Sequence, residues 1–380
     1  MILRTYVRTN ERTNVRTNER TYDELKLYTY LCRNYTMTNF IFDYADSLEY
    51  HENITSEITF TESAEFTFDE GCIDALRNNH RESYRHIAER YSKNERIFDI
   101  EPYTNDYIVL DHALVSANGV IINSDKRIFT NGGCICRRLD NAFVDKISKE
   151  TNVVSITSLW SDGIWHFSLE AFVALKSIPK DILVNSKIHV SKITRFIIQI
   201  CNLINIQESQ LVTGNIYADK VYIPRMGKCG NPYFNQICWM KDLVTKSIQT
   251  TTRRYMILIK RNHRRVLLNY NEIEQFCTEL CEKSELELYI HDDNNLPPIT
   301  EQYRIFHQAK YVFAPHGAGG INLMSMQPDS WYIEFLSKED INICFSRLAY
   351  FLNVNYKGLL MENSTVNLEN MKIVVNDILK

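Results

Sequence analysis

One segment constrains the fold more than any other, and it reads YVFAPHGAGGINLMSMQPDSWYIEF from Tyr311 to Phe335. An apolar run ends at Pro315, three glycines follow within four positions, and a second apolar run closes the segment at 331–335. The chain has only 12 glycines in 380 residues, so the cluster is not background. The pattern predicts a strand, a glycine-rich loop, a short helix and a second strand. Such a loop presents bare backbone N–H groups at a helix N-terminus, where a phosphate or pyrophosphate can bind.

Two other interpretations fit a glycine cluster. A plain strand-to-helix turn also uses glycine, because glycine adopts positive φ without a steric penalty. The oxyanion loop of an α/β-hydrolase contains a similar His-Gly segment. That fold also needs a Gly-x-Ser-x-Gly nucleophile elbow, and the chain contains no such pentapeptide. The phosphate loop and the plain turn therefore stay open at this point.

The second half of the chain alternates apolar runs with helical patterns. We expect strands at 255–259, 286–290, 311–314 and 331–335, and helices at 271–283, 300–308 and 341–352. Such alternation predicts an α/β fold with a parallel sheet covered by helices. Ligands bind beyond the carboxyl ends of the strands in such sheets, and Arg261, His291 and His316 all follow these ends.

The first half is harder to interpret. Residues 108–128 predict hairpins, because Asn118-Gly119 is a strong turn signal between apolar runs. Further elements are expected as helices at 141–150, 167–176 and 194–204 and as short strands at 155–160, 182–184 and 222–223.

The length of the chain, 380 residues, exceeds what one hydrophobic core usually supports, so we expect two domains. Residues 4–23 repeat with a period of four and one arginine per unit, which is typical of a disordered tail. The expected boundaries are a low-complexity basic tail over 1–24, a first domain over 25–245, a second domain over 246–355 that contains the glycine loop, and an extension over 356–380.

Net charge and hydropathy limit the classes of partner and the location that the sequence favours. A net charge of −4 argues against nucleic acid as the main partner. No apolar run reaches the ~20 residues that cross a bilayer, and the N-terminus lacks the apolar core of a signal peptide. The sequence as it stands favours the cytoplasm, whereas a longer N-terminus would place the protein in the secretory pathway (Golgi or ER).

A basic cluster follows the expected strand at 255–259. It consists of Lys260, Arg261, His263, Arg264 and Arg265. Facing the glycine loop across a parallel sheet, these side chains can neutralise a diphosphate, and arginine offers bidentate contacts. A solvated loop of charges is the alternative.

Three carboxylate patterns invite a chemical interpretation. Glu334 ends the strand after the glycine loop, where a carboxylate can accept both hydroxyls of a ribose; a partly exposed strand residue is the alternative. His166 and Glu170 stand at i and i+4, so on a helix they share one face and either can act as a base. A satisfied core histidine is the alternative for His166. The pair Asp292-Asp293 favours a turn over a metal site.

With these residues in hand, the chain resembles glycosyltransferase family 61. The C-terminal motif of that family is matched by Pro315 to Gly319, Asn322 and Glu334. Further matches are Gln302, Lys260-Arg261, Arg264-Arg265, Asn271-Glu272 and, in the first domain, His166 followed by Glu170. The chain departs from the family pattern at Lys260, at Gly320-Ile321 and at Gly163, where the family usually has asparagine beside the expected base.

The resemblance implies two Rossmann-like domains that face each other across a cleft, an arrangement called GT-B. The domain over 25–245 would then lie on the acceptor side, and the domain over 246–355 would bind the nucleotide-sugar. It implies an inverting transfer of GlcNAc or a pentose from a UDP-sugar to a hydroxyl of a glycan or glycoprotein, without a metal or another cofactor. The donor-binding residues would be Arg261, Arg264, Arg265, Gln302, His316, Gly317, Ala318, Gly319, Asn322 and Glu334. The base would be His166 or Glu170.

Two other functions remain open on the sequence. A catalytically inactive module that binds a sugar-nucleotide or a glycan is one, because Gly163 departs from the family beside the expected base. A nucleotide-binding scaffold or metabolic enzyme unrelated to sugars is the other, since isolated motifs mislead.

Overall fold

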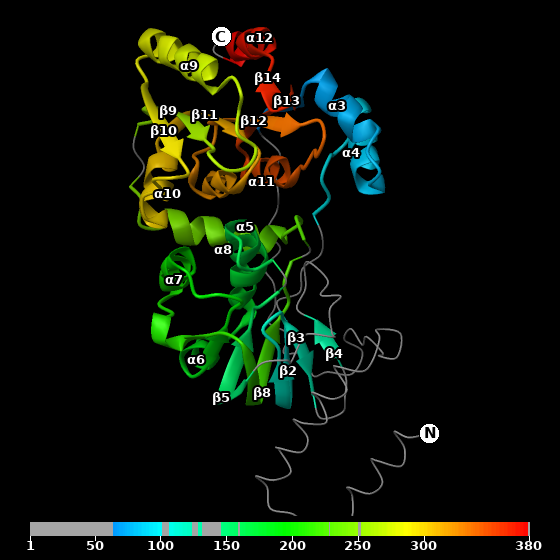
Figure 1. Cartoon of the computed structure of the whole chain (residues 1–380), viewed down its shortest axis with the longest axis vertical. Coiled ribbons are helices and arrows are strands. Elements are labelled where there is room, and N and C mark those ends of the chain that lie inside the picture. Colours follow the sequence, from blue (N-terminus) through cyan, green and yellow to red (C-terminus); the bar gives the residue numbers. More distant parts are fainter. Residues whose placement is uncertain are drawn as a thin grey trace, which may run out of the picture.

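The structure, a computed structural model, describes residues 64–100, 106–123, 128–130, 146–158, 160–227, 229–249 and 252–378. The basic tail expected over 1–24 lies outside these residues. Figure 1 shows two α/β units stacked along the long axis of the molecule, with the helices α5 (Ile164–His166) and α8 (Phe234–Thr245) between them. Among the described residues no helix combines the length and the hydropathy that a membrane span needs.

The first unit contains a mixed sheet. Its described strands run in the order β4-β3-β2-β8-β5-β6-β7. They are β2 (Tyr107–Val115), β3 (Val120–Ile122), β4 (Ile128–Thr130), β5 (Ile147–Ser155), β6 (Lys187–His189), β7 (Leu211–Val212) and β8 (Asn215–Pro224). The pairs β5–β6, β6–β7 and β5–β8 are parallel, whereas β8–β2, β2–β3 and β3–β4 are antiparallel.

The expected hairpin is confirmed as β2 and β3. The backbone N–H of Gly119 donates to the carbonyl of Ser116, and Gly119 has φ +88°. A Cβ at Gly119 would lie 2.1 Å from the carbonyl oxygen of Thr157. Glycine is therefore required both by the left-handed backbone and by the close approach of the neighbouring chain.

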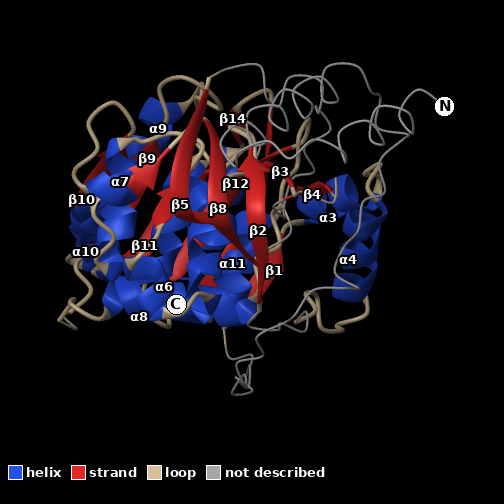
Figure 2. Ribbon diagram, turned by 90° about the horizontal axis from the view of Figure 1, so that it is seen from below, coloured by secondary structure: helices blue, strands red, loops and turns tan. Residues whose placement is uncertain are grey.

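Helices cover this sheet. They are α5, the π-helix η2 (Phe167–Ala171), the 3₁₀-helix η3 (Phe172–Ser177), α6 (Lys180–Val184), α7 (Arg195–Cys201), the short η4 (Asn202–Ile204) and η5 (Glu208–Gln210), and α8. Figure 1 and Figure 2 both show α6 and α7 on the β5 side of the described strands, whereas α8 lies between the two units.

Three sequence expectations in the first unit are wrong. The apolar run at 182–184 lies in helix α6, which begins directly after Pro179, a residue whose fixed φ suits a helix start. Residues 147–150, expected as helix, belong to β5, because pairing with β8 overrides local propensity. The strand expected at 155–160 is absent, since β5 ends at Ser155.

The second unit contains a parallel sheet, as the alternating pattern predicted. Its order is β1-β13-β12-β11-β9-β10, and β14 pairs antiparallel with β13. The strands are β1 (Phe66–Phe68), β9 (Tyr255–Lys260), β10 (Glu287–Asp292), β11 (Ala309–Pro315), β12 (Trp331–Ser337), β13 (Asn355–Glu362) and β14 (Thr365–Val366). The helices are α3 (Glu70–Arg77), α4 (Glu82–Ser92), α9 (Tyr270–Ser284), α10 (Ile299–His307), the 3₁₀-helix η6 (Ala318–Ser325), α11 (Cys344–Leu352) and α12 (Leu368–Ile378).

Two expected domain boundaries differ from this arrangement. Strand β1 pairs with β13, and the ring of Phe66 stacks on that of Tyr356 with centroids 4.8 Å apart, so this early segment belongs to the second unit. Strand β13 lies between β12 and β1, so residues 355–362 are interior strand and not an extension. Pairing partners about 290 residues apart leave no local trace in the sequence.

The direction of the chain reverses in the middle of the second sheet. From β9 the chain passes to β10 on one side, and then to β11, β12 and β13 on the other side. The carboxyl ends of β9 and β11 therefore flank a topological switch point, which is where ligands bind in open α/β sheets. Arg261 follows the first of these strands and His316 follows the second.

One hydrophobic cluster spans both units, and each unit also has a cluster of its own. A single cluster of buried residues includes Phe167 and Ile197 of the first unit together with Tyr303 and Phe345 of the second. The rings of Trp165 and Phe345 meet edge to face, with centroids 4.8 Å apart. The residues Ile164 to His166 are thereby held against the second unit, close to the switch point.

Candidate active site

Arg261 and the glycine loop adjoin at the switch point, as the strand ends predicted. The guanidinium Nη1 of Arg261 lies 3.4 Å from the backbone carbonyl oxygen of His316, to which it donates. A Cβ at Gly317 would lie only 1.3 Å from the same nitrogen. The backbone of Gly317 is extended, so glycine is needed there because the guanidinium occupies the space of a side chain.

The Arg261 guanidinium is a buried cation that is only partly compensated. Its side chain is 15% exposed, and its Nε lies 3.9 Å from an Asp293 carboxylate oxygen. Burial lowers the pKa of Arg261, and the charge of Asp293 opposes that effect. Nε finds no hydrogen-bond acceptor within the described part of the chain. An anion that enters here would meet a charge with spare donors.

Helix η6 begins directly after Gly317 and adds backbone donors. The N–H of Gly320 donates to the carbonyl of Gly317 at 2.9 Å, so the N–H groups of Ala318 and Gly319 precede the first intrahelical bond. A Cβ at Gly320 would lie 2.6 Å from the ring of Phe345. Because glycine has no side chain, η6 can pack closely on α11. The partial positive charge of the helix start adds to that of Arg261.

Gln302 and Asn322 support this loop from within. The Asn322 amide donates to the carbonyl of Gly319 at 3.1 Å and to the Gln302 side-chain oxygen at 3.3 Å. Gln302 in turn donates to the carbonyl of Pro297 at 2.8 Å. Both amides are buried. Gln302 lines the pocket described next, whereas Asn322 acts on the shape of the loop.

A small pocket of about 90 Å³ lies over the switch point. Residues of both units line it, among them Ile164, Arg261, His291, Gln302, Ala318 and Gly319. Nδ1 of His291 has no hydrogen-bond partner in the described part of the chain. Burial lowers the pKa of His291 to about 4, so its ring is neutral at physiological pH. The strand-end pattern placed His291 correctly but gave it no role.

Glu334 does not face this pocket, in contrast to the ribose contact expected from the sequence. One carboxylate oxygen lies 2.6 Å from Nδ1 of His316, and the other accepts a bond from the Tyr356 hydroxyl at 2.8 Å. Glu334 is fully buried. Strand β12 continues to Ser337, so Glu334 lies within the strand and not at its end.

The His316 imidazole is also buried beneath the loop. Its side chain is 6% exposed, and its Nε2 points to the Cys344 thiol at 4.0 Å. The expected contact between this ring and a diphosphate therefore has no geometric support. His316 contributes through its backbone carbonyl, which accepts from Arg261, while Glu334 fixes its ring.

The other cations of the basic cluster lie elsewhere. Arg264 is exposed on the surface. Arg265 lies 3.4 Å from Asp340, and Lys260 lies 4.0 Å from Asp292. The pair Asp292-Asp293 forms the expected turn, in which Asp292 accepts from the backbone N–H of Asn294 at 2.8 Å.

His166 and Glu170 meet on one face, as predicted. Nδ1 of His166 lies 2.9 Å from a Glu170 carboxylate oxygen. The Glu170 side chain is 1% exposed and that of His166 is 27% exposed, so only the histidine reaches solvent. Burial lowers the pKa of His166, but the hydrogen bond and the charge of Glu170 raise it by more, so the net shift is upward.

The π-helix η2 explains how Glu170 is held. A π-turn brings residues i and i+5 together, and Nε1 of Trp165 donates to the Glu170 carboxylate at 3.1 Å. The backbone N–H of Gly230 donates to the same oxygen at 2.8 Å. Neither partner was found from the sequence, because the π-turn has no recognisable residue pattern and Gly230 is 60 residues away.

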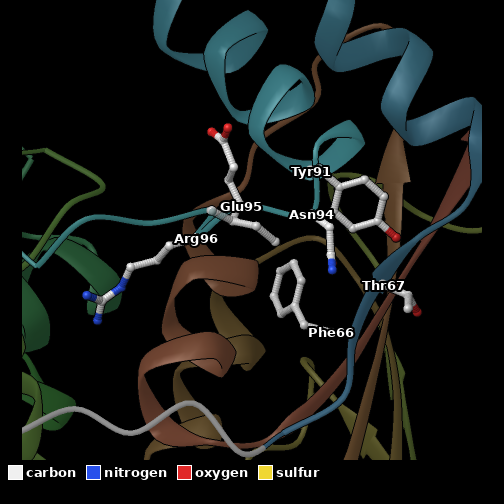
Figure 3. A pocket seen from close by; sticks show the side chains of 7 residues that line it. Phe66, Thr67, Tyr91, Asn94, Glu95 and Arg96 are labelled. Atoms are coloured by element: carbon white, nitrogen blue, oxygen red, sulfur yellow. The ribbon is translucent and has the colours of Figure 1, made fainter.

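A larger cavity lies beside β1, an edge strand of the second sheet. It measures about 590 Å³ and lies between the start of β1 and the end of α4, where Phe66, Thr67, Tyr91 and Asn94 surround it (Figure 3). None of the predicted site residues lines it. We place the candidate active site at the smaller pocket, because a strand switch point, the Arg261 cation and the first N–H groups of η6 meet there in the described part of the chain.

Comparison with known proteins identifies the family. The model for the family described as glycosyltransferase 61 matches residues 164–333. This match begins at the helix that carries His166 and ends in β12, so it contains Arg261, the glycine loop and Glu170. No curated protein matches the chain. The predicted resemblance is confirmed over these residues: residues 164–333 match glycosyltransferase family 61, and the enzyme is a glycosyltransferase.

Proposed function

We propose that the enzyme transfers a sugar, GlcNAc or a pentose, from a UDP-sugar to a hydroxyl of a glycan or glycoprotein, with inversion and without a metal. The two α/β units would act as the two halves of a GT-B cleft. One observation carries the proposal: the Arg261 guanidinium lies on Gly317 at the switch point, where it meets the start of η6. A cation and backbone donors at one point suit a diphosphate.

The donor diphosphate would bind to Arg261 and to the first N–H groups of η6. Without a metal, the negative charge that develops on the leaving diphosphate must be stabilised by such fixed donors. Nε of Arg261 is buried and has no partner in the described part of the chain, so it can serve the diphosphate without breaking an existing bond. Gln302 and Asn322 would hold the loop in the required shape.

His166 would act as the base. Its Nδ1–H donates to Glu170, which leaves the lone pair of Nε2 for the acceptor hydroxyl. As that oxygen attacks the anomeric carbon, its proton passes to Nε2 while the bond to the diphosphate breaks, and the bonding electrons leave with the diphosphate oxygen. A single displacement inverts the anomeric centre. Glu170 would orient the ring and stabilise the imidazolium that forms.

The pocket must enlarge before a UDP-sugar can enter. Ligand sites measure ~300–1,000 Å³, whereas the pocket over the switch point measures about 90 Å³. Ile164 of the first unit forms one wall and Ala318 of the second forms another. We therefore expect the two units to separate at this wall when the donor binds, and to close again for the reaction.

Calorimetric titration of UDP and a panel of UDP-sugars in EDTA tests the donor site. Wild type, Arg261→Ala and Arg264→Ala would be compared, since the two variants remove the same charge from one loop. We expect nucleotide binding that Arg261→Ala weakens strongly and Arg264→Ala changes little. Equal binding by all three proteins, or no binding of any UDP compound, would refute the donor site.

An inactive sugar-nucleotide or glycan-binding module is the alternative, and one observation favours it. Gly163 is the N-cap residue of helix α5, in front of His166, and it offers no side chain to cap the helix. A Cβ at Gly163 would have room, with its nearest contact at 3.4 Å. Donor binding without any turnover in wild type would support this alternative. If Gly163→Asn then gained activity, the missing cap would be the cause.

A further inference from the structure

One side chain beside the His166–Glu170 pair has no part in the proposed transfer. This is the Cys229 thiol, on the loop before α8. A nitrogen of His166, a carboxylate oxygen of Glu170 and Sγ of Cys229 all lie within 4.8 Å of one another. We propose that these three side chains form a zinc-binding site that holds the enzyme inactive. The inhibition rests on the proposed role of His166, whereas the binding of zinc does not.

Distances between the ligand atoms suit zinc. Zn–N and Zn–O bonds measure ~2.0–2.2 Å, so two such ligands on one ion lie roughly 3 Å apart. Nδ1 of His166 and the Glu170 oxygen are 2.9 Å apart, and a proton now occupies the space between them. Cys229 is exposed, so a rotation of its side chain can shift Sγ by about 1 Å and bring it to a Zn–S distance of ~2.3 Å.

The partners of Glu170 already form a second coordination shell. Trp165 and the backbone N–H of Gly230 donate to one carboxylate oxygen, so the other oxygen is left for a metal. The Gly230 carbonyl in turn accepts from the Arg347 guanidinium at 2.5 Å. The backbone N–H and the carbonyl of Gly230, the residue after Cys229, are thus both held by hydrogen bonds. Hydrogen bonds of this kind to the ligand residues orient them and raise metal affinity.

The ligand set also selects the metal. One histidine, one carboxylate and one thiolate leave a fourth tetrahedral position for water, which is a common arrangement at open zinc sites. A thiolate disfavours magnesium and calcium, which prefer oxygen ligands. The ion can enter from solvent, because His166 is 27% exposed at its side chain and Cys229 is exposed.

Zinc at Nδ1 would disable the base. The neutral ring has one proton, which must move from Nδ1 to Nε2 when the metal takes the Nδ1 lone pair. Nε2 then cannot accept the proton of the acceptor hydroxyl. The Cys229 thiol releases its own proton to solvent as it becomes a ligand. Removing the metal restores both protons and the base.

The test is a zinc titration of the full chain, reduced and freed of metal, in competition with a chromogenic chelator. Wild type, Cys229→Ser and Cys238→Ser would be compared. Cys238 lies on α8 and is partly buried, so its replacement controls for the loss of a thiol. Because the comparison isolates Cys229, zinc bound by cysteines outside the described residues does not obscure it.

We expect wild type and Cys238→Ser to bind zinc alike, and Cys229→Ser to bind it at least about tenfold more weakly. Cobalt in place of zinc should give a thiolate charge-transfer band that Cys229→Ser abolishes. Equal affinities in wild type and Cys229→Ser, or no such band in wild type, would overturn the site.

Transfer assays separate the site from the proposed base. In EDTA, Cys229→Ser should retain wild-type transfer, and equimolar zinc should inhibit wild type far more than this variant. If zinc binds through Cys229 and leaves transfer unchanged, then His166 is not the base and the inhibitory role is refuted, although the metal site itself stands. Chelator competition therefore decides the site, and the transfer assay decides its consequence.

Discussion

Gly317→Ala should abolish the contact on which the donor site depends. The new methyl group would lie 1.3 Å from Nη1 of Arg261. Carbon and nitrogen atoms that are not bonded stay roughly 3.5 Å apart, so the guanidinium must retreat by about 2 Å. The backbone at Gly317 is extended and suits alanine, so the variant changes the position of Arg261 without straining the loop.

The loss of affinity follows from the bonds that Arg261 would make. A hydrogen bond to a charged group contributes about 1.5–3 kcal/mol, and every 1.4 kcal/mol is a factor of ten. Gly317→Ala should therefore weaken UDP binding roughly 10- to 140-fold. Calorimetry in EDTA measures this change, and thermal unfolding shows that the variant is folded.

A double-mutant cycle identifies the cause. Arg261→Ala should lose about as much affinity as Gly317→Ala, and the double variant should lose little more, because both changes remove one contact. Arg264→Ala removes an equal charge from the exposed part of the same loop and should change UDP binding only slightly. Wild-type affinity in Gly317→Ala, or losses that multiply in the double variant, would refute the reasoning.

Three further predictions follow from the buried groups. Glu170→Gln should lower the transfer rate roughly 10²- to 10⁴-fold and leave the UDP dissociation constant unchanged. The reason is that Glu170 holds His166 and lies outside the donor pocket. A lowered affinity for UDP would contradict this prediction. His316→Ala should destabilise the fold by about 3–5 kcal/mol in chemical denaturation, because Glu334 loses its buried partner; near-wild-type stability would contradict the burial. Finally, acid should weaken the fold through His189, whose pKa is lowered from 6.5 to about 4, chiefly by burial. As the pH falls, His189 binds a proton in the unfolded chain at a higher pH than in the folded chain. The contribution of neutral His189 to the free energy of unfolding is therefore complete above pH 6.5 and is lost as the pH falls towards 4, by about 2 kcal/mol between pH 6.5 and 5. Denaturation at several pH values should show that slope, and His189→Gln should flatten it; an unchanged slope would exclude His189.

The parallel sheet of the second unit was predictable because its strands are buried on both faces. Such strands appear as continuous apolar runs, and the helices between them have their own period. The carboxyl-end rule then brought Arg261 and the glycine loop together, although 55 residues separate the atoms that meet. Pairing between β1 and β13 was missed for the opposite reason: a strand of three residues has no period to recognise.

The first unit was less predictable, since its sheet mixes parallel and antiparallel pairs. Residues 147–150 favour a helix locally, and only pairing with β8 makes them a strand. The pattern at His166 and Glu170 was recognised correctly but could not show which of the two side chains reaches solvent. That decision depends on Trp165 and Gly230, which bury the carboxylate through a π-turn and a distant loop.

At Glu334 the role expected from the sequence and the observed geometry differ. In register, Glu334 lies between Ala314 on β11 and Gly358 on β13, two small residues that leave room for a buried carboxylate. One of its oxygens then pairs with His316, directly after β11, and the other accepts from Tyr356 on β13. The sequence pattern placed Glu334 on the strand after the glycine loop, but it could not show which way the side chain faces. In the proposed donor site Gly317 and Ala318 would form the surface that meets the donor, whereas His316 and Glu334 pair beneath the loop. On this account His316→Ala tests this buried pair, and Arg261 together with Gly317 tests the donor site itself.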